Sequence, residues 1–272
     1  MLLSLRAVYS LSLFNGLTEQ LQTAGWVSSP ADSLIQPSEE TTYEASYLFF
    51  NIGMAKFHLI GKTSYDGIPA YKIVAHIDSY SGIPFVNYHA VYETYADART
   101  LMCLFTFNRQ KSGDDWIHTS YSFNFPDKEI EWKQTKDDKV IKEDILPLDR
   151  DYTDGLSFYY FVRRACLNAD GRRTNLTIPI ISDTVLSTVD MTINEAREPC
   201  RVPAFDFPID SYRMSGHINF KGTFGVTGNF TGWISADSLE VPLKGDLQVI
   251  LGNIVVKLKD IHGRVWAPPR EK

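Results

Sequence analysis

The strongest constraint in this sequence is an alternation of apolar and polar residues with a period of two. Residues 43–49 alternate Tyr, Ala, Tyr and Phe with Glu, Ser and Leu, and similar runs occupy residues 55–59 and 71–77. Because successive side chains of a strand point to opposite faces, this period predicts strands. Turn-forming glycines punctuate the runs at Gly53, Gly67, Gly82 and Gly113. We therefore expect one strand to follow another from residue 41 onward.

The same pattern continues along the rest of the chain, with one interruption. Further strands are predicted at residues 88–95, 101–109, 116–125, 129–134, 185–193, 213–220, 229–236, 246–251 and 253–258, with a tight turn at Gly252-Asn253. The connections are too short for the crossover helices that a parallel sheet requires. An antiparallel meander, packed on one face and wet on the other, is therefore favoured.

The interruption is a single predicted helix from Asp154 to about Asn168. Thr153 or Asp154 offers the N-cap oxygen, and the Arg163-Arg164 pair is expected to complement the helix dipole near the C-terminal end. We expect a mainly β fold in which one strongly curved, half-barrel-like antiparallel sheet surrounds this central helix. Two sheets packed as a sandwich are the alternative. Either arrangement must close or cover its sheet edges.

The length of 272 residues fits a single β-rich domain with short segments at both ends. We assign residues 39–262 to this domain, residues 1–38 to an N-terminal segment and linker, and residues 263–272 to a disordered C-terminal tail. The first 17 residues are apolar with one cation, Arg6, which is typical of an export signal. An amphipathic N-terminal helix is the alternative.

Composition excludes several classes of protein. Apolar residues make up 44% of the chain, which rules out wholesale disorder. The net charge of −6 leaves no basic footprint for nucleic acid, and no apolar run is long enough to predict a membrane-spanning helix. Cys103, Cys166 and Cys200 form no metal or redox motif. They are either three buried free thiols or one disulfide with one free thiol.

Motifs for catalysis or metal binding do not stand out. His76 and His89 could approach each other across neighbouring strands, but surface or half-buried histidines explain them equally. The GTFGVTG segment at residues 222–228 precedes no helix, so it offers no phosphate site. We expect no enzyme activity, no metal site and no cofactor. A hydrolase would need two carboxyl groups facing each other across a cleft, and we keep it as a further alternative.

The most suggestive feature is the abundance of aromatic residues, which form 13% of the chain. A curved sheet with a helix in its mouth can hold an apolar ligand between such rings. A core built of large rings is the alternative. The candidate ligand-binding residues are Tyr43, Tyr47, Phe57, Tyr71, Tyr88, Tyr92, Tyr159 and Trp233.

Five segments, taken in order, resemble a known family. They are residues 40–47 (ETTYEASY) followed by Gly53, residues 71–75 (YKIVA), residues 92–97 (YETYAD), residues 154–163 (DGLSFYYFVR), and residues 233–237 (WISAD) followed by Val241-Pro242-Leu243. Together they span about residues 39–261 and resemble the bacterial envelope family known as domain of unknown function 3108. The chain departs from that family at Leu239-Glu240, where a basic residue often precedes the Val-Pro step, and its N-terminal signal is less clean.

This resemblance implies an exported, β-rich domain that is periplasmic or associated with the outer membrane. It carries over no catalytic residue. We hypothesise a non-catalytic domain that holds a lipid, another hydrophobic molecule or an extended partner segment in an aromatic-lined concavity. A structural subunit of an envelope protein assembly, bound through an exposed sheet edge, is the alternative.

Overall fold

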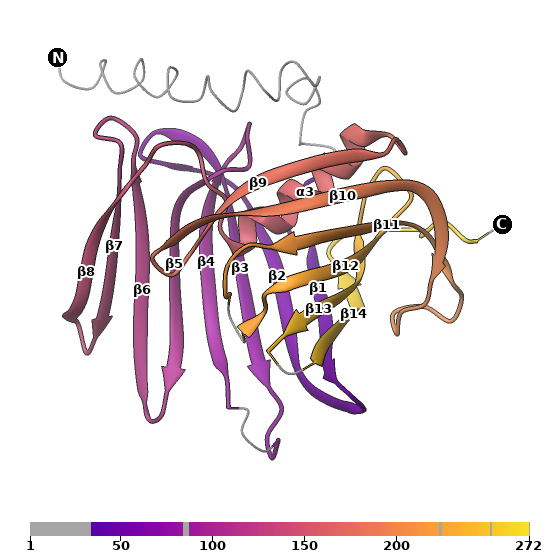
Figure 1. Cartoon of the computed structure of the whole chain (residues 1–272), viewed down its shortest axis with the longest axis horizontal. Helices are drawn as coiled ribbons and strands as arrows, with labels where there is room; N and C mark the ends of the chain where they lie inside the picture. The colour runs from indigo at the N-terminus through magenta and orange to yellow at the C-terminus, as the bar shows by residue number, and fades with distance from the viewer. Residues whose placement is uncertain (1–33, 84–86, 223–224, 251, 272) are drawn as a thin grey trace.

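The described part of the chain folds into one curved antiparallel sheet around one helix (Figure 1). The computed structural model describes residues 34–83, 87–222, 225–250 and 252–271, so the expected export segment at the N-terminus lies outside them. Within the described chain fourteen strands are hydrogen-bonded in the single series β8-β7-β6-β5-β4-β3-β2-β1-β14-β13-β12-β11-β10-β9. The expectation of one curved sheet is therefore confirmed, and the sandwich alternative is wrong.

The elements have the following bounds. The first run of strands is β1 (Glu40–Tyr47), β2 (Phe50–Tyr65), β3 (Ile68–Ser79), β4 (His89–Asp97), β5 (Cys103–Ser112), β6 (Asp115–Asn124), β7 (Glu129–Lys136) and β8 (Lys139–Pro147). The helix is α3 (Gly155–Ala169). The second run is β9 (Thr174–Ser182), β10 (Val185–Cys200), β11 (Ile209–Ile218), β12 (Gly228–Ser235), β13 (Pro242–Val249) and β14 (Gly252–His262).

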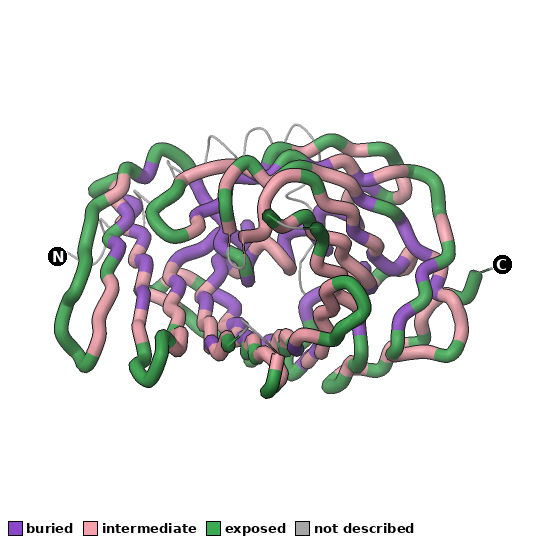
Figure 2. Tube along the Cα trace, turned by 60° about the horizontal axis from the view of Figure 1, so that its bottom comes forward, coloured by how far each residue is buried: buried purple, intermediate pink, exposed green. Residues whose placement is uncertain are grey.

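The edge strand β9 is attached to the segment that precedes α3. Thr153, just before α3, forms a parallel bridge with Ile180 of β9, because its amide donates to the Pro179 carbonyl at 3.0 Å. The preceding Tyr152 accepts a hydrogen bond from the Cys103 amide at the start of β5. This short segment therefore ties one end of β9 to the opposite half of the sheet. Figure 2 shows the sheet curling back toward itself around α3.

Helix α3 is fixed at its N-terminus by the predicted N-cap residue Asp154. Its side chain accepts a hydrogen bond from the Ser157 amide at 2.9 Å, and the Ser157 hydroxyl accepts one from the Asp154 amide, which completes a capping box. The other carboxylate oxygen of Asp154 accepts hydrogen bonds from Thr94 of β4 and Thr106 of β5. One buried carboxylate thus caps the helix and joins it to two strands.

The apolar face of α3 packs into the largest hydrophobic cluster. Leu156, Tyr160 and Cys166 are each less than 5% exposed there, and they meet Tyr71 of β3 and Met214 of β11. The alternating inward residues that predicted the strands supply the other side of this cluster. The core therefore lies between the helix and the concave face of the sheet.

The first hairpin turns four residues earlier than the glycine pattern predicts. Phe49, expected within a strand, lies at the β1–β2 turn and is 96% exposed, whereas Gly53, expected in a turn, lies inside β2. A side chain at Gly53 would meet the Asp78 carbonyl oxygen at 2.4 Å. Glycine is thus required by close backbone approach at a bulge and not by a turn.

Two further boundary expectations are wrong. The last hairpin turns before Gly252 and not after it, which leaves Ile250 at its tip. The C-terminal tail, expected to be disordered, packs on the domain. Arg270 bridges to Ile209 and places its guanidinium 4.2 Å from the Phe207 ring centroid, while Trp266 meets Phe205 edge-on. Aromatic and main-chain partners offset the entropy of ordering this tail.

The cysteines are three free thiols, all of them buried. Cys166 lies on α3 with its Sγ 3.5 Å from the Sδ of Met214. Burial raises the pKa of Cys103 and Cys166 well above the ordinary thiol value. The disulfide alternative is therefore wrong, and these thiols act as small apolar side chains.

We expect Asp154→Ala to lower the free energy of unfolding by about 2–4 kcal/mol, since it removes an N-cap and leaves two buried threonine hydroxyls without their shared acceptor. Urea denaturation followed by circular dichroism measures this loss. Asp149→Ala, at an exposed position just upstream, is the matched control and should cost less than 1 kcal/mol. Equal losses in the two variants would contradict the role assigned to Asp154.

Candidate functional site

The concave face of the sheet is apolar beyond the reach of α3. Across β11, β12, β13, β14 and β1, directly paired residues form one row, which consists of Gly216, Phe230, Leu247, Ile254 and Tyr47. Every residue of this row is half-buried. Directly paired residues share one face of a sheet, and Phe230 packs against the cluster that holds the helix. The row therefore belongs to the inner face.

A second row on the same face consists almost entirely of small residues. It runs through Gly232, Gly245, Val256, Ala45 and Gly53. A Cβ at Gly245 would meet only the Leu247 side chain, at 3.8 Å. The small residues project less from the sheet than the side chains of the first row, such as Phe230 and Tyr47. We call the two rows together the inner apolar surface.

Helix α3 covers this surface only in part, since Gly232 and Gly53 are buried whereas the large apolar residues are half-buried. Its principal neighbours in the described chain are β3, β4 and β9, whereas the inner apolar surface lies on β11 to β14 and on β1 and β2. Phe230, Leu247 and Ile254 consequently remain partly accessible to solvent. A concave face with accessible apolar side chains is the kind of surface that binds an apolar ligand.

The sequence-predicted aromatic residues divide between this surface and the core. Phe57 stacks on Tyr159 of α3 with ring centroids 4.7 Å apart, and Tyr43 meets both rings edge-on. The Tyr43 and Tyr159 hydroxyls lie 2.7 Å apart, and burial raises the pKa of Tyr43 well above its ordinary value. Tyr71 is fully buried. These four rings fasten the helix to the sheet.

Tyr47, Tyr88 and Tyr92 are the predicted residues that stay partly accessible on the inner side. Tyr47 belongs to the inner apolar surface. The hydroxyls of Tyr88 and Tyr92 are hydrogen-bonded to each other, and Tyr92 shares a face with Ala75, a core residue of β3. Burial, followed by the neighbouring Tyr92 hydroxyl, raises the pKa of Tyr88. This pair places polar groups beside an otherwise apolar face.

Trp233, the remaining predicted residue, lies on the opposite face of the sheet. It lines an outer groove of about 610 Å³ together with Glu198, Lys244 and Lys257. Its indole N–H donates to Glu198, and the Lys244 ammonium lies 4.1 Å from its ring centroid. The structure therefore does not bring Trp233 together with the other seven aromatic residues.

A second outer hollow of about 580 Å³ lies over β9 to β12 and is polar. Asp190 accepts hydrogen bonds there from Thr177 at 2.7 Å and Asn219 at 2.9 Å, and these bonds lower its pKa. His217 is paired with Asn229 at 2.9 Å. These polar groups are hydrogen-bonded to one another, which is typical of a solvated sheet face.

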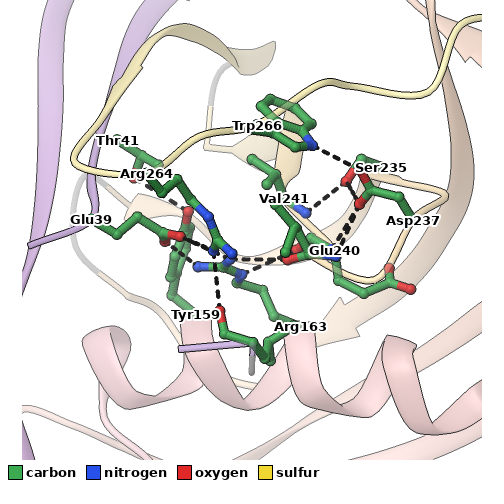
Figure 3. Close-up of polar contacts among 12 residues, drawn as sticks. Glu39, Thr41, Tyr159, Arg163, Ser235, Asp237, Glu240, Val241, Arg264 and Trp266 are labelled. Atoms are coloured by element: carbon green, nitrogen blue, oxygen red, sulfur yellow. Dashed lines mark hydrogen bonds and ion pairs between the residues drawn. The ribbon is translucent and has the colours of Figure 1, made fainter. Parts of the chain in front are cut away.

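A buried ionic cluster, which sequence reasoning did not find, joins the ends of the chain to α3 (Figure 3). Glu39, just before β1, accepts hydrogen bonds from both Arg163 of α3 and Arg264 after β14. All three side chains are at most 1% exposed. Burial would raise the pKa of Glu39, but the two guanidinium groups hold it below its ordinary value. The cluster is therefore charged, with one carboxylate shared by two guanidinium groups.

The adjacent arginines of α3 hold loops from the two halves of the sheet. Arg163 donates to the carbonyls of Leu239 at 2.9 Å and Glu240 at 3.2 Å, in the β12–β13 connection. Arg164 donates to the carbonyls of Arg99, at 2.6 Å, and Thr100 in the β4–β5 connection. The expectation that this pair serves the helix dipole is wrong, because both side chains are buried and neither lies in the last turn.

Glu240 is the exception within this polar region. It is 4% exposed and its Oε2 has no hydrogen-bond partner, while Figure 3 shows its carboxyl group directed away from Arg163. Burial, reinforced by the nearby Asp237, raises the pKa of Glu240 to about 9. Its backbone adopts a left-handed φ of 44°, which is unusual for a side-chain-bearing residue. The carboxyl group is therefore neutral at pH 7.

The histidines do not come together. His89 is paired with Asp78 across β3 and β4, with Nδ1 and Oδ1 2.8 Å apart, while His76 is paired with Val91. Within the described residues no group of three or more His, Cys, Asp or Glu side chains is arranged to hold a metal ion. The glycine-rich segment 222–228 is a connection that leads into β12 and not into a helix.

The family model described as "Protein of unknown function (DUF3108)" matches residues 42–259 of the chain. The chain belongs to the DUF3108 family. The sequence resemblance is thereby confirmed, and the departure noted before the Val-Pro step falls on the unpaired Glu240. No curated protein matches this DUF3108 chain.

Two solved structures are similar to this chain. A β-barrel-like protein of the DUF1849 family from Brucella abortus resembles the DUF3108 chain with a TM-score of 0.54 at 9% identity, covering 82% of this chain and 96% of that one. A Bacteroides fragilis protein proposed to be exported, with a YmcC-like fold, matches over 84% of this chain and 96% of its own at 9% identity, with a TM-score of 0.28. The first likeness shows a common fold.

Helices of the described region include none with the length and apolar character needed to cross a membrane. This finding accords with the absence of a long apolar run in the sequence of this DUF3108 protein.

Glu240 predicts a pH dependence of stability. Between its ordinary pKa of 4.5 and the folded value of about 9, the folded chain binds more protons than the unfolded chain, so this group destabilises the fold progressively as pH rises. We expect Glu240→Gln to raise the free energy of unfolding by on the order of 2 kcal/mol at pH 8 and by much less at pH 5. Urea denaturation at both pH values measures the difference.

Glu195→Gln, at an exposed position of β10, is the matched control and should leave stability nearly unchanged at both pH values. An increase for Glu240→Gln that is the same at pH 5 and pH 8 would contradict the assignment, since it would not depend on ionisation.

Proposed function

We propose that this protein is a non-catalytic domain that binds an extended apolar ligand, an acyl chain or a group of similar chemistry, along its inner apolar surface. The observation that carries the proposal is the row Phe230, Leu247, Ile254 and Tyr47, which is apolar, concave and partly accessible. Covering such side chains contributes about 25 cal/mol for each Å² of apolar area removed from water.

The neighbouring small residues supply the room for a ligand. Gly232, Gly245 and Ala45 lie side by side on β12, β13 and β1 with only Val256 between them. Side chains of ordinary size at these positions would fill the concave face, as they do in small closed barrels. Small side chains beside larger apolar ones suit an extended hydrocarbon chain, which needs apolar contact along its length.

Two buried carboxyl groups of the described chain, those of Asp154 and Glu39, have structural partners that occupy them, whereas that of Glu240 is buried without one. Asp154 is engaged by the helix N-terminus and by two threonines, and Glu39 by two arginines. A general acid or base must be free to exchange a proton with a substrate. We propose that the protein acts without catalysis and that it does so in the cell envelope, as the DUF3108 resemblance implies.

A structural role in an envelope assembly is the second candidate, and strand β8 favours it. β8 is exposed along almost its whole length, and Val140, Ile141 and Ile145 are between 47% and 61% exposed. An open edge of this kind can pair with a strand of another protein. Lys139, Lys142 and Glu143 on the same strand work against uncontrolled pairing.

Gly245→Phe tests the binding proposal. A Cβ at Gly245 would meet only the Leu247 side chain, at 3.8 Å, on the inner apolar surface, so we expect the variant to fold and to bind 11-(dansylamino)undecanoic acid at least tenfold more weakly than the wild type. Fluorescence titration measures the affinity, and native mass spectrometry of the wild-type protein, purified from its own envelope fraction, detects any lipid that accompanies it.

Thr231→Phe is the matched control, because it adds a ring to the outer face of the sheet on β12, where Thr231 precedes the Gly232 that pairs with Gly245. It should bind the probe as the wild type does, with both variants retaining the wild-type circular dichroism spectrum. Wild-type affinity in Gly245→Phe, or the absence of probe binding in the wild type, would refute the proposal and favour the structural role.

A further inference from the structure

The antiparallel topology gathers seven connections at the end of the sheet away from α3. They are the turns that follow β1, β3, β5, β7, β9, β11 and β13, because each of these strands runs toward that end and its successor runs back. Four of them lie next to one another in sheet order, namely β3–β4, β1–β2, β13–β14 and β11–β12. We call this end of the central strands the far rim.

The far rim is free of negative charge. The described residues of its four connections and their flanks occupy positions 47–55, 79–83, 87–88, 218–222, 225–232, 247–250 and 252–256, which contain no Asp or Glu and a single lysine, Lys221. The whole chain has 33 acidic residues. The three connections outside the far rim include Asp114, Asp137 and Asp183. The exclusion of carboxylates is thus confined to the central strands.

The far rim also carries the most exposed apolar tip of the domain. Leu48, Phe49 and Phe50 at the β1–β2 turn are 70%, 96% and 66% exposed. Ile250 at the tip of the adjacent β13–β14 hairpin is 66% exposed and lies beside Gly225 of the β11–β12 connection. Consecutive large apolar side chains with this exposure are unfavourable in water and mark a contact surface.

The shape and chemistry of the far rim favour a lipid surface over a protein partner. A hairpin tip is convex and narrow, whereas stable protein interfaces need broad complementary surfaces. A bilayer accepts a protruding apolar tip without a shaped partner, and its anionic headgroups repel carboxylates but tolerate a lysine. We propose that the far rim docks on a phospholipid bilayer by inserting Leu48, Phe49 and Phe50 among the acyl chains.

Docking in this orientation brings the inner apolar surface to the membrane. Phe50 is paired with Tyr47, and Tyr47 with Ile254 of the inner row, so the inserted tip and the inner apolar surface are continuous. The proposal explains why apolar residues stay exposed at this rim while the outer faces of β9 to β12 are polar. The docking proposal depends on the residues of the far rim and not on ligand binding by the inner apolar surface.

Vesicle sedimentation with the full chain tests the proposal. We expect the wild type to sediment with vesicles of 80% phosphatidylcholine and 20% phosphatidylglycerol. Phe49→Asp should bind them at least tenfold more weakly, because the phenyl ring that inserts among the acyl chains is replaced by a charged carboxylate. Val265→Asp is the matched control, since Val265 is 98% exposed but follows β14 at the helix end of the sheet. It should sediment as the wild type does.

A spectroscopic measurement follows the tip directly. Because the three native thiols are buried, Phe49→Cys can be labelled selectively with a nitrobenzoxadiazole dye under native conditions. Insertion predicts a blue shift and rise of its emission on adding vesicles. Failure of the wild type to sediment, equal loss in both Asp variants, or a Phe49-dependent dimer in ultracentrifugation without vesicles would overturn the proposal.

The two proposals fail separately. Gly245→Phe should lose the fatty-acid probe but keep vesicle binding, and Phe49→Asp should keep the probe in the absence of vesicles. Loss of vesicle binding in Gly245→Phe would show that lipid is held by the inner apolar surface and would overturn docking by the tip.

Discussion

Two neighbouring arginines on α3 hold the architecture together. The sheet is a single open series of fourteen strands, and an open sheet of this size has no closing ladder of its own to set its curvature. Arg163 donates hydrogen bonds to carbonyls of the β12–β13 connection in one half of the sheet, and Arg164 donates to carbonyls of the β4–β5 connection in the other half. Carbonyl acceptors in both halves are thereby brought to the same turn of one helix.

The ionic part of this arrangement adds a third constraint. Glu39 links Arg163 to Arg264, so the residues just before β1 and just after β14 are joined to the helix as well. Removing one partner of such a buried group leaves an uncompensated charge, which is far more costly than the net value of the pair. The cluster therefore specifies one arrangement of helix and chain ends more strongly than it adds stability.

Sequence reasoning predicted twelve of the fourteen strands, the helix and its N-cap because these depend on local patterns, but it missed β8 and β9. It could not assign the faces of the sheet. Trp233 and Tyr47 look alike in an alternating pattern, yet they lie on opposite faces, since Tyr47 belongs to the row of Phe230 and Trp233 lies three positions after Phe230 on β12. The roles of Arg163 and Glu39 depend on partners 124 positions apart, which no local spacing reveals.

The candidate surface was predictable in kind but not in position. The abundance of aromatic residues pointed to a concave apolar face, but most of those rings pack around α3. The half-buried apolar part lies instead beside Gly232 and Gly245, two small residues that only the register places in one row. Glycines in a strand pattern are ambiguous until the pairing is known.

The pairing of β1 with β14 has a consequence for biogenesis. Thr41 lies opposite Ile261, so the middle of the sheet joins residues from almost the full span of the chain. The hairpins on either side involve near neighbours, and local contacts form faster than distant ones. The two halves of the sheet can therefore form while the chain is still emerging from a ribosome or a translocation pore. Until the last strand arrives, β1 remains an unpaired edge that a chaperone or a second chain could occupy.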